Sequence, residues 1–412
     1  MQTLVQIMIK HRRSRSILLI WFIATLISSA SMISAWTLHI DGFNRAISNL
    51  FYMIALPGWI PIYALGFSGI RDQPIAIIAA SSLSWLFWIW IVSIAVRVHG
   101  RLHSNARGDR SERPSPPESP SRRAFIGNAV LGVGAIGAAT SPTYATLIEP
   151  WAIKVRSYTI PIRGLPRSLE NLRLVQFSDS HLGPRMPASF IKHAADLVVQ
   201  LEPDIVLLTG DYVHDGVDDI EQAAELCKPM IEAANIATVG VLGNHDWWGD
   251  GRRMSKALQA HGVHMIDNDR VWIDPDSRSL STEKRSNALA LVGLGDLTED
   301  IVDPIRAFRD VDQLTPRVVL AHHPDTAEQP ELIRQNAPRI DLMVSGHTHG
   351  GQVRLPLLGT PLVPSEYGSK YAGGLVQGPA FPVLISRGVG LSLLPVRFGV
   401  PPELVEITLV RA

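Results

Sequence analysis

LRLVQFSDSH, residues 172–181, joins an apolar run of strand length to two polar side chains, Asp179 and His181. The apolar side chains among the first six residues are typical of a buried strand. The polar pair follows where that strand is expected to end. In open α/β sheets, functional sites gather beyond the carboxyl ends of the strands, so this pair is a candidate for such a site.

The same arrangement recurs along the second half of the chain. Apolar runs at 204–209, 238–242, 318–321 and 342–345 are each followed by a short polar cluster. Helix-like stretches at 188–200, 218–234 and 326–335 lie between them, so the sequence predicts β-α-β alternation and an α/β fold. Side chains far apart in sequence then meet at one edge of a sheet. The clusters are Gly210-Asp211, Gly243-Asn244-His245-Asp246, His322-His323 and Gly346-His347-Thr348-His349.

In this order, the clusters resemble the ligand blocks of the calcineurin-like metallophosphoesterases, and within them the membrane-anchored bacterial branch. The resemblance extends over roughly residues 157–410. It implies an α/β fold, a four-layer α-β-β-α sandwich of two mixed sheets, preceded by an all-α transmembrane region. It also implies a hydrolase that acts on phosphoester bonds.

The resemblance implies two divalent metal ions. One would be held by Asp179, His181, Asp211 and His349, and the other by Asp211, Asn244, His322 and His347. Asp211 would bridge them, because a carboxylate has two oxygens and offsets part of the repulsion between the ions. In the His322-His323 pair the resemblance favours His322, and His323 stays an alternative. Oxygen and imidazole ligands without cysteine suit Mn, Fe or Zn, and the sequence leaves the metal open.

The implied chemistry is hydrolysis of a phosphoester. A hydroxide shared by the two ions would attack phosphorus, and His245 would act as general acid toward the leaving oxygen. Asp246, the next residue, is expected to orient the His245 imidazole and raise its pKa. His193, His214, His261 and His264 match no position of the family pattern, so we interpret them as ordinary surface or core histidines. Trp247-Trp248 could either stack on a substrate ring or pack a loop.

The N-terminal third is of a different class. The runs 17–38, 46–70 and 75–96 contain no charged side chain, and each is long enough to cross a hydrocarbon core of about 30 Å. The sequence therefore predicts a transmembrane helical region at 1–98 and an Arg/Ser/Pro-rich linker at 99–123. A final membrane anchor at 124–148 follows. Together with the preceding Arg122-Arg123 it resembles a twin-arginine export signal. The metallophosphoesterase domain is predicted at 150–412.

Two basic segments give conflicting predictions of the membrane topology. The cluster at residues 10–15 and the linker at 99–123 both favour the cytoplasmic side, yet three predicted spans separate them. Either the span at 46–70, which contains Pro57 and Pro61, does not cross fully, or one basic segment lies outside. We give more weight to the linker. That choice predicts a multi-pass protein of a bacterial cytoplasmic membrane with its catalytic domain outside the cytoplasm.

Other features exclude several classes of function. There is no dinucleotide-binding fingerprint and no serine-nucleophile elbow. The catalytic half has no interleaved basic and aromatic stripe, so nucleic acid is not expected as a partner. Cys227 is the only cysteine, which excludes an intrachain disulfide.

The expected substrate is a phosphorylated lipid, an envelope precursor or a small phosphate compound, since some similar proteins cleave the pyrophosphate of UDP-diacylglucosamine. Alternatives are an exported, broad phosphodiesterase and a non-enzymatic membrane scaffold or sensor. The sequence leaves the oligomeric state open.

Overall fold

A computed structural model of the chain describes residues 144–356, 359–392 and 394–412. Residues 147–412 form one compact unit. The predicted transmembrane helices, the linker and most of the predicted anchor lie outside the described residues. Within the described ranges, no helix combines the length and the apolar character that crossing a bilayer requires.

The first sheet has six strands and carries the first half of the candidate site. Strands β2 to β5 are mutually parallel, β13 is antiparallel to β2, and β1 is parallel to β13. In spatial order the strands are β1 (Lys154–Ile162), β13 (Glu403–Arg411), β2 (Leu172–Phe177), β3 (Ile205–Thr209), β4 (Ala237–Val241) and β5 (His264–Met265).

The second sheet has seven strands and carries the rest of the site. Strands β12, β10, β9 and β8 are parallel, whereas β11, at one end, and β6 and β7, at the other, are joined through antiparallel pairs. The spatial order is β11 (Gly374–Gln377), β12 (Pro382–Ile385), β10 (Leu342–Ser345), β9 (Arg317–Leu320), β8 (Leu289–Gly293), β6 (Arg270–Ile273) and β7 (Leu280–Ser281).

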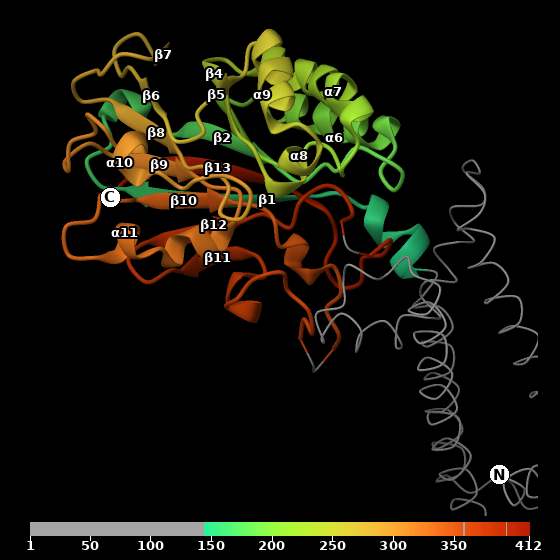
Figure 1. The fold of residues 1–412 in the computed structure, drawn as a ribbon. Coiled ribbons are helices and arrows are strands. Elements are labelled where there is room, and N and C mark those ends of the chain that lie inside the picture. Colours follow the sequence, from blue (N-terminus) through green and yellow to red (C-terminus); the bar gives the residue numbers. More distant parts are fainter. Residues whose placement is uncertain (1–143, 357–358, 393) are drawn as a thin grey trace, which may run out of the picture. The chain divides into compact units, whose positions relative to one another are not determined.

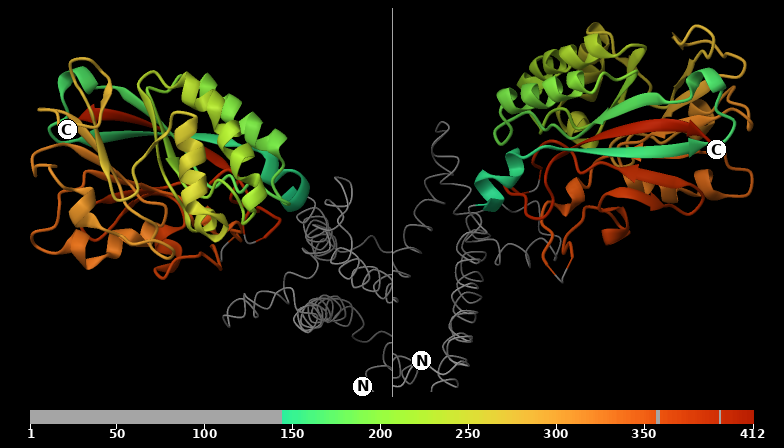
Figure 2. Two further views of the ribbon diagram at one scale, coloured as in Figure 1. Left: turned by 45° about the horizontal axis from the view of Figure 1, so that its top comes forward. Right: turned by 180° about the vertical axis from the view of Figure 1, so that it is seen from behind.

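The two sheets face each other across a shared apolar core. Leu174 and Leu207 of the first sheet belong to the same buried cluster as Leu291 and Val318 of the second. Helices α6 (Ala188–Gln200), α7 (Ile220–Ala233) and α9 (Gly251–Ala260) cover the outer face of the first sheet (Figure 1). Short helices α10 (Pro304–Ala307) and α11 (Pro330–Ile333) lie on the side of the second sheet (Figure 2). The protein is thus an α/β sandwich of two mixed sheets, as predicted.

The predicted helix at 326–335 is wrong. The chain forms a 3-10 helix at Pro324–Glu328 and then α11, with Gln329 between them in an extended conformation (φ −65°, ψ 131°). Pro330 explains the break, because a proline ring disfavours the helical conformation of the preceding residue. By contrast, the predicted helix at 188–200 and the predicted strands at 172–177 and 342–345 are confirmed.

Candidate metal centre

The predicted ligands follow the carboxyl ends of β2, β3, β9 and β10 and the start of α8 (Asn244–Gly249). The turns that present them are sharp. Asp179, His181, Asp211, His347 and His349 all have positive φ angles, between 49° and 67°. Non-glycine residues rarely adopt this conformation, although Asp and His adopt it more readily than most.

A first group of side chains comprises Asp179, His181 and His349. All three are buried. Nε2 of His181 lies 2.8 Å from Nε2 of His349, and Nε2 of His349 lies 3.5 Å from Oδ1 of Asp179. The same Asp179 oxygen accepts a hydrogen bond of 2.8 Å from the backbone N–H of His347. The structure thus brings one predicted ligand set together.

A second group comprises Asp211, His322 and His347, with Asn244 beside it. Oδ1 of Asn244 lies 3.0 Å from Nδ1 of His347, and that nitrogen lies 3.3 Å from Nε2 of His322. Nδ1 of His322 lies 2.7 Å from the carbonyl oxygen of Thr209. A carbonyl oxygen only accepts, so Nδ1 is the donor, and in the neutral ring Nε2 then carries the lone pair that a metal ion needs.

Asp211 lies between the two groups. Its Oδ2 is 3.4 Å from Nε2 of His181 and 3.2 Å from Nε2 of His322. Its Oδ1 accepts a hydrogen bond of 2.9 Å from the backbone N–H of His245, which fixes the carboxylate. One oxygen therefore faces both groups at once, which is the position that a bridging carboxylate takes.

The chemistry of these side chains fits two metal ions. Two imidazole nitrogens only 2.8 Å apart are expected where both address one cation. Oδ2 of Asp179 is buried without a hydrogen-bond partner, although a buried carboxylate oxygen ordinarily has one. Burial lowers the pKa of His181 well below its usual range, so the imidazole is neutral, as a ligand must be. The pKa of Asp211 also lies well below its usual range. Burial raises this pKa, but the nearby His322 and His245 together lower it by more.

His322 and His323 occupy different places. His322 belongs to the second group, with its ring fully buried. His323 stacks on the ring of His347 at a centroid distance of 4.0 Å, and its Nδ1 accepts a hydrogen bond of 3.3 Å from the backbone N–H of Asp325. His323 thus supports the His347 ring and caps the following 3-10 helix, which leaves His322 as the residue facing Asp211.

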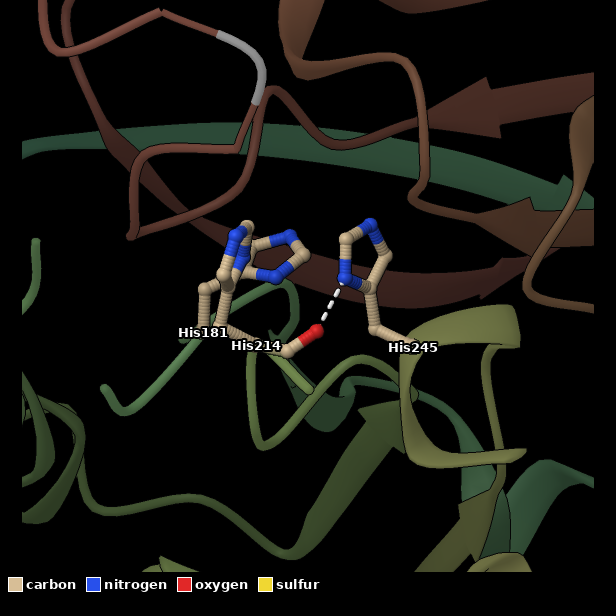
Figure 3. A group of neighbouring side chains, drawn as sticks. All are labelled: His181, His214 and His245. Carbon is tan, nitrogen blue, oxygen red and sulfur yellow. Dashed lines mark hydrogen bonds between the residues drawn. The ribbon is translucent and has the colours of Figure 1, made fainter. Parts of the chain in front are cut away.

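His245 is placed at the same edge but is held differently from our prediction. Its Nδ1 bonds to the backbone carbonyl of His214 (Figure 3). Asp246 does not contact the imidazole: its two oxygens accept from the backbone N–H groups of Asp211 and Gly243, both at 2.9 Å, and of Tyr212 at 2.8 Å. The predicted role of Asp246 in orienting His245 is therefore corrected. Asp246 ties the Asp211 turn to the start of α8, because its carboxylate accepts from N–H groups of both segments.

Comparisons with known proteins agree with this geometry. The family model described as calcineurin-like phosphoesterase matches residues 172–351. Phosphodiesterase YaeI of Escherichia coli (strain K12) is 32% identical over 242 residues, which cover 58% of this chain and 82% of that protein. This chain belongs to the calcineurin-like phosphoesterases. It is accordingly a metallophosphoesterase, a hydrolase acting on phosphoester bonds.

Two other relatives of this calcineurin-like phosphoesterase have informative names. A "transmembrane protein with metallophosphoesterase domain" of Danio rerio is 28% identical over 336 residues, covering 79% of this chain and 71% of that protein. UDP-2,3-diacylglucosamine pyrophosphatase LpxG of Chlamydia trachomatis is 27% identical over 309 residues, covering 63% of this chain and 90% of that protein.

Two residues near the centre of this calcineurin-like phosphoesterase were not predicted from the sequence. The ring of His214 lies 5.0 Å from that of His245 and 5.7 Å from that of His181, measured between centroids (Figure 3). Arg397 is fully buried, and its Nη2 lies 3.3 Å from Nδ1 of His349. The available signal for His214 was its place in the turn that begins with Asp211. The loop around Arg397 was expected near the substrate from the resemblance, but the burial of the Arg397 side chain against His349 was not predicted.

Proposed function

We propose that this chain hydrolyses phosphodiester or pyrophosphate bonds with two divalent ions, one held by Asp179, His181, Asp211 and His349 and the other by Asp211, Asn244, His322 and His347. The observation that carries the proposal is the position of Asp211 Oδ2, within 3.4 Å of His181 and 3.2 Å of His322. When bound, the two ions lower the pKa of a water molecule and stabilise negative charge on the phosphoryl oxygens.

The protein's own contribution is to hold and deliver a proton at His245. Nδ1 of His245 faces the His214 carbonyl, so Nε2 is the nitrogen available to the substrate. The imidazole contacts three rings, with centroids 4.0 Å from Trp248, 4.5 Å from His181 and 5.0 Å from His214. In its protonated form, Nε2 donates to the leaving oxygen as the phosphoester bond breaks. The His214 carbonyl thus takes the orienting role that we first expected of Asp246.

The substrate class that we propose is a phosphorylated lipid or a related envelope compound. The named activity of LpxG, a pyrophosphatase of a diacylated sugar nucleotide, supports a lipid-linked substrate. The relative named as a transmembrane protein supports the predicted anchoring of this chain in a membrane. YaeI, named a phosphodiesterase, supports the second candidate, a broader phosphodiesterase. The predicted extracytoplasmic side of the catalytic domain is retained within this proposal.

The test is metal-dependent hydrolysis by the full chain in detergent. The protein is stripped of metal and reloaded with Mn, Fe or Zn, and hydrolysis of a chromogenic phosphomonoester and a phosphodiester is measured. We expect metal-dependent cleavage of the diester that Asp211→Asn abolishes, because the amide supplies one neutral oxygen in place of a bridging carboxylate. Equal turnover by Asp211→Asn, or turnover without metal, would contradict the proposal.

A further inference from the structure

The chain enters the compact unit at the edge where the candidate metal centre lies. β1 runs parallel to β13, and β13 runs antiparallel to β2. β1 therefore starts at the edge where β2 ends, and β2 leads directly to Asp179. The residues just before β1 consequently meet the sheet on the side of the metal centre and not at the opposite edge (Figure 1).

Specific contacts fix this first segment to the site. Glu149 is buried, and its Oε2 accepts a hydrogen bond of 2.9 Å from the backbone N–H of Gly399. Arg397, two residues earlier in the same loop, approaches His349. Trp151 packs edge-on against Phe190 of α6, with ring centroids 5.1 Å apart. The segment is thus held against the loop that backs the metal centre and against the first helix.

Apolar side chains nevertheless remain exposed there. We call the residues Leu147, Ile148, Trp151 and Val155 the N-terminal rim; they are 47%, 53%, 36% and 43% exposed. Lys154, also exposed, lies among them. Single exposed apolar residues are ordinary, but four within nine positions are not scattered. Tryptophan and aliphatic side chains beside a lysine are the composition of a surface that lies in the headgroup layer of a membrane.

The apolar stretch 126–139 precedes the N-terminal rim in sequence, and Lys154 complements anionic headgroups. We propose that the N-terminal rim contacts the headgroup layer of a lipid bilayer and turns the metal-centre edge toward it. The scissile phosphate would then belong to an amphiphile held in that bilayer. The substrate part of this inference rests on the proposed phosphoesterase reaction, whereas the contact of the rim with lipid does not.

The first experiment measures the depth of two probes on the full chain in anionic phospholipid vesicles. Cys227 is the only cysteine and is buried, so an added cysteine can be labelled with an environment-sensitive fluorophore. Val155→Cys reports on the N-terminal rim. Ser277→Cys is the matched control, because it lies in the exposed turn between β6 and β7, at the far edge of the second sheet.

We expect a lipid-borne quencher to act on the probe at residue 155 and an aqueous quencher to act on the probe at residue 277. Equal exposure of both probes to the aqueous quencher would overturn the inference. Hydrolysis of a soluble phosphodiester is measured on the same samples. If that hydrolysis persists while the probe at residue 155 stays in water, the inference fails and the proposed reaction stands. If hydrolysis is absent while the probe at residue 155 is immersed in lipid, the contact of the rim with lipid stands and the proposed reaction fails.

The second experiment compares substrates. Ile148→Asp places a charge on the N-terminal rim, and Leu314→Asp is its control, an aliphatic residue 85% exposed just before β9, at the far edge. The substrates are a diacylglycerol p-nitrophenyl phosphate embedded in vesicles and a soluble p-nitrophenyl phosphodiester. We expect Ile148→Asp to lower hydrolysis of the embedded ester several-fold and to leave the soluble ester unaffected, with no change from Leu314→Asp. An equal effect of the two variants on the embedded ester would contradict the inference.

Discussion

The carboxylate of Asp246 accepts hydrogen bonds from four backbone N–H groups, whereas the imidazole of His245 bonds to a single carbonyl and otherwise faces rings. Removing the two side chains should therefore have different consequences. Asp246→Ala leaves buried donors of the Asp211 turn unpaired. We expect it to lower the free energy of unfolding by about 2–5 kcal/mol and to reduce the metal content. His245→Ala should leave the free energy of unfolding and the metal content unchanged and lower kcat by about 10²–10⁴-fold.

Denaturant titration, metal analysis and turnover on the two variants check this pair of expectations. The discriminating quantity is metal content per folded chain. If His245→Ala loses metal as Asp246→Ala does, His245 supports the site structurally and the proton-donating role is lost. If Asp246→Ala retains full metal and stability, the backbone contacts of its carboxylate carry little free energy.

The identity of the clustered side chains was predictable because each follows an apolar strand run in sequence. Their partners were not. Asp246 was assigned to His245 from adjacency, yet successive side chains at the start of a helix point in different directions. The carbonyl of His214 has no side-chain signature, so no pattern could indicate that it accepts from His245. His214 itself was interpreted as an ordinary histidine because its turn, not its residue type, brings it to the site.

Gly243, at the junction of β4 and α8, packs closely against the backbone of Asp211 in the turn after β3. A Cβ atom on Gly243 would lie 2.3 Å from Oδ1 of Asp211 and 2.7 Å from its backbone nitrogen. Gly243→Ala should therefore displace Asp211 and lower metal content and turnover together. Gly249→Ala, at the end of the same helix, is the control, since its nearest neighbour would be 3.9 Å away. Metal analysis and thermal unfolding distinguish the two.

Because Gly249→Ala also adds a methyl group to α8, a general effect on that helix would appear in both variants. A selective loss of metal in Gly243→Ala is the expected outcome. Full metal and activity in Gly243→Ala would mean that the Asp211 turn yields without cost, and the backbone contact would then not position the carboxylate.

Elements that are buried on both faces were the easiest to predict. The apolar runs of β2 and β10 coincide with the predicted strands, because a run of only four to six largely buried residues is too short for most helices. The predicted helix at 326–335 failed at Pro330, where local backbone restriction outweighs the pattern of apolar residues. Helix α8 was not predicted, because its six residues begin within the polar cluster and show no helical periodicity.

For the whole molecule, the sequence predicted β-α-β alternation, and only the resemblance supplied the second sheet. The reason is physical. The inner strands of both sheets are buried and apolar, so hydrophobicity alone does not assign Leu207 and Val318 to different sheets that share one core. The pairings that close the first sheet join residues far apart in sequence, such as Lys154 opposite Glu403. Such long-range register leaves no trace in a local pattern.

The chain crosses from the first sheet to the second near Asp267, between β5 and β6, and this crossing should make stability depend on pH. Asp267 accepts a hydrogen bond of 2.8 Å from the backbone N–H of Leu242, and burial raises its pKa to about 7. In the unfolded chain its pKa is about 3.9. Between these values the unfolded state releases the proton while the folded state retains it, so this group lowers stability as pH rises from about 4 to 7.

Asp267→Asn keeps an oxygen for the Leu242 N–H and cannot ionise. We expect the variant to match the parent near pH 4 and to exceed it at pH 8, by an amount on the order of 2 kcal/mol because Asp267 is only partly buried. Denaturant unfolding of both proteins at pH 4.5, 6 and 8 gives the difference directly. A constant difference across this range would show that Asp267 has the same pKa in the folded and unfolded states. Its contribution to the free energy of unfolding would then not depend on pH.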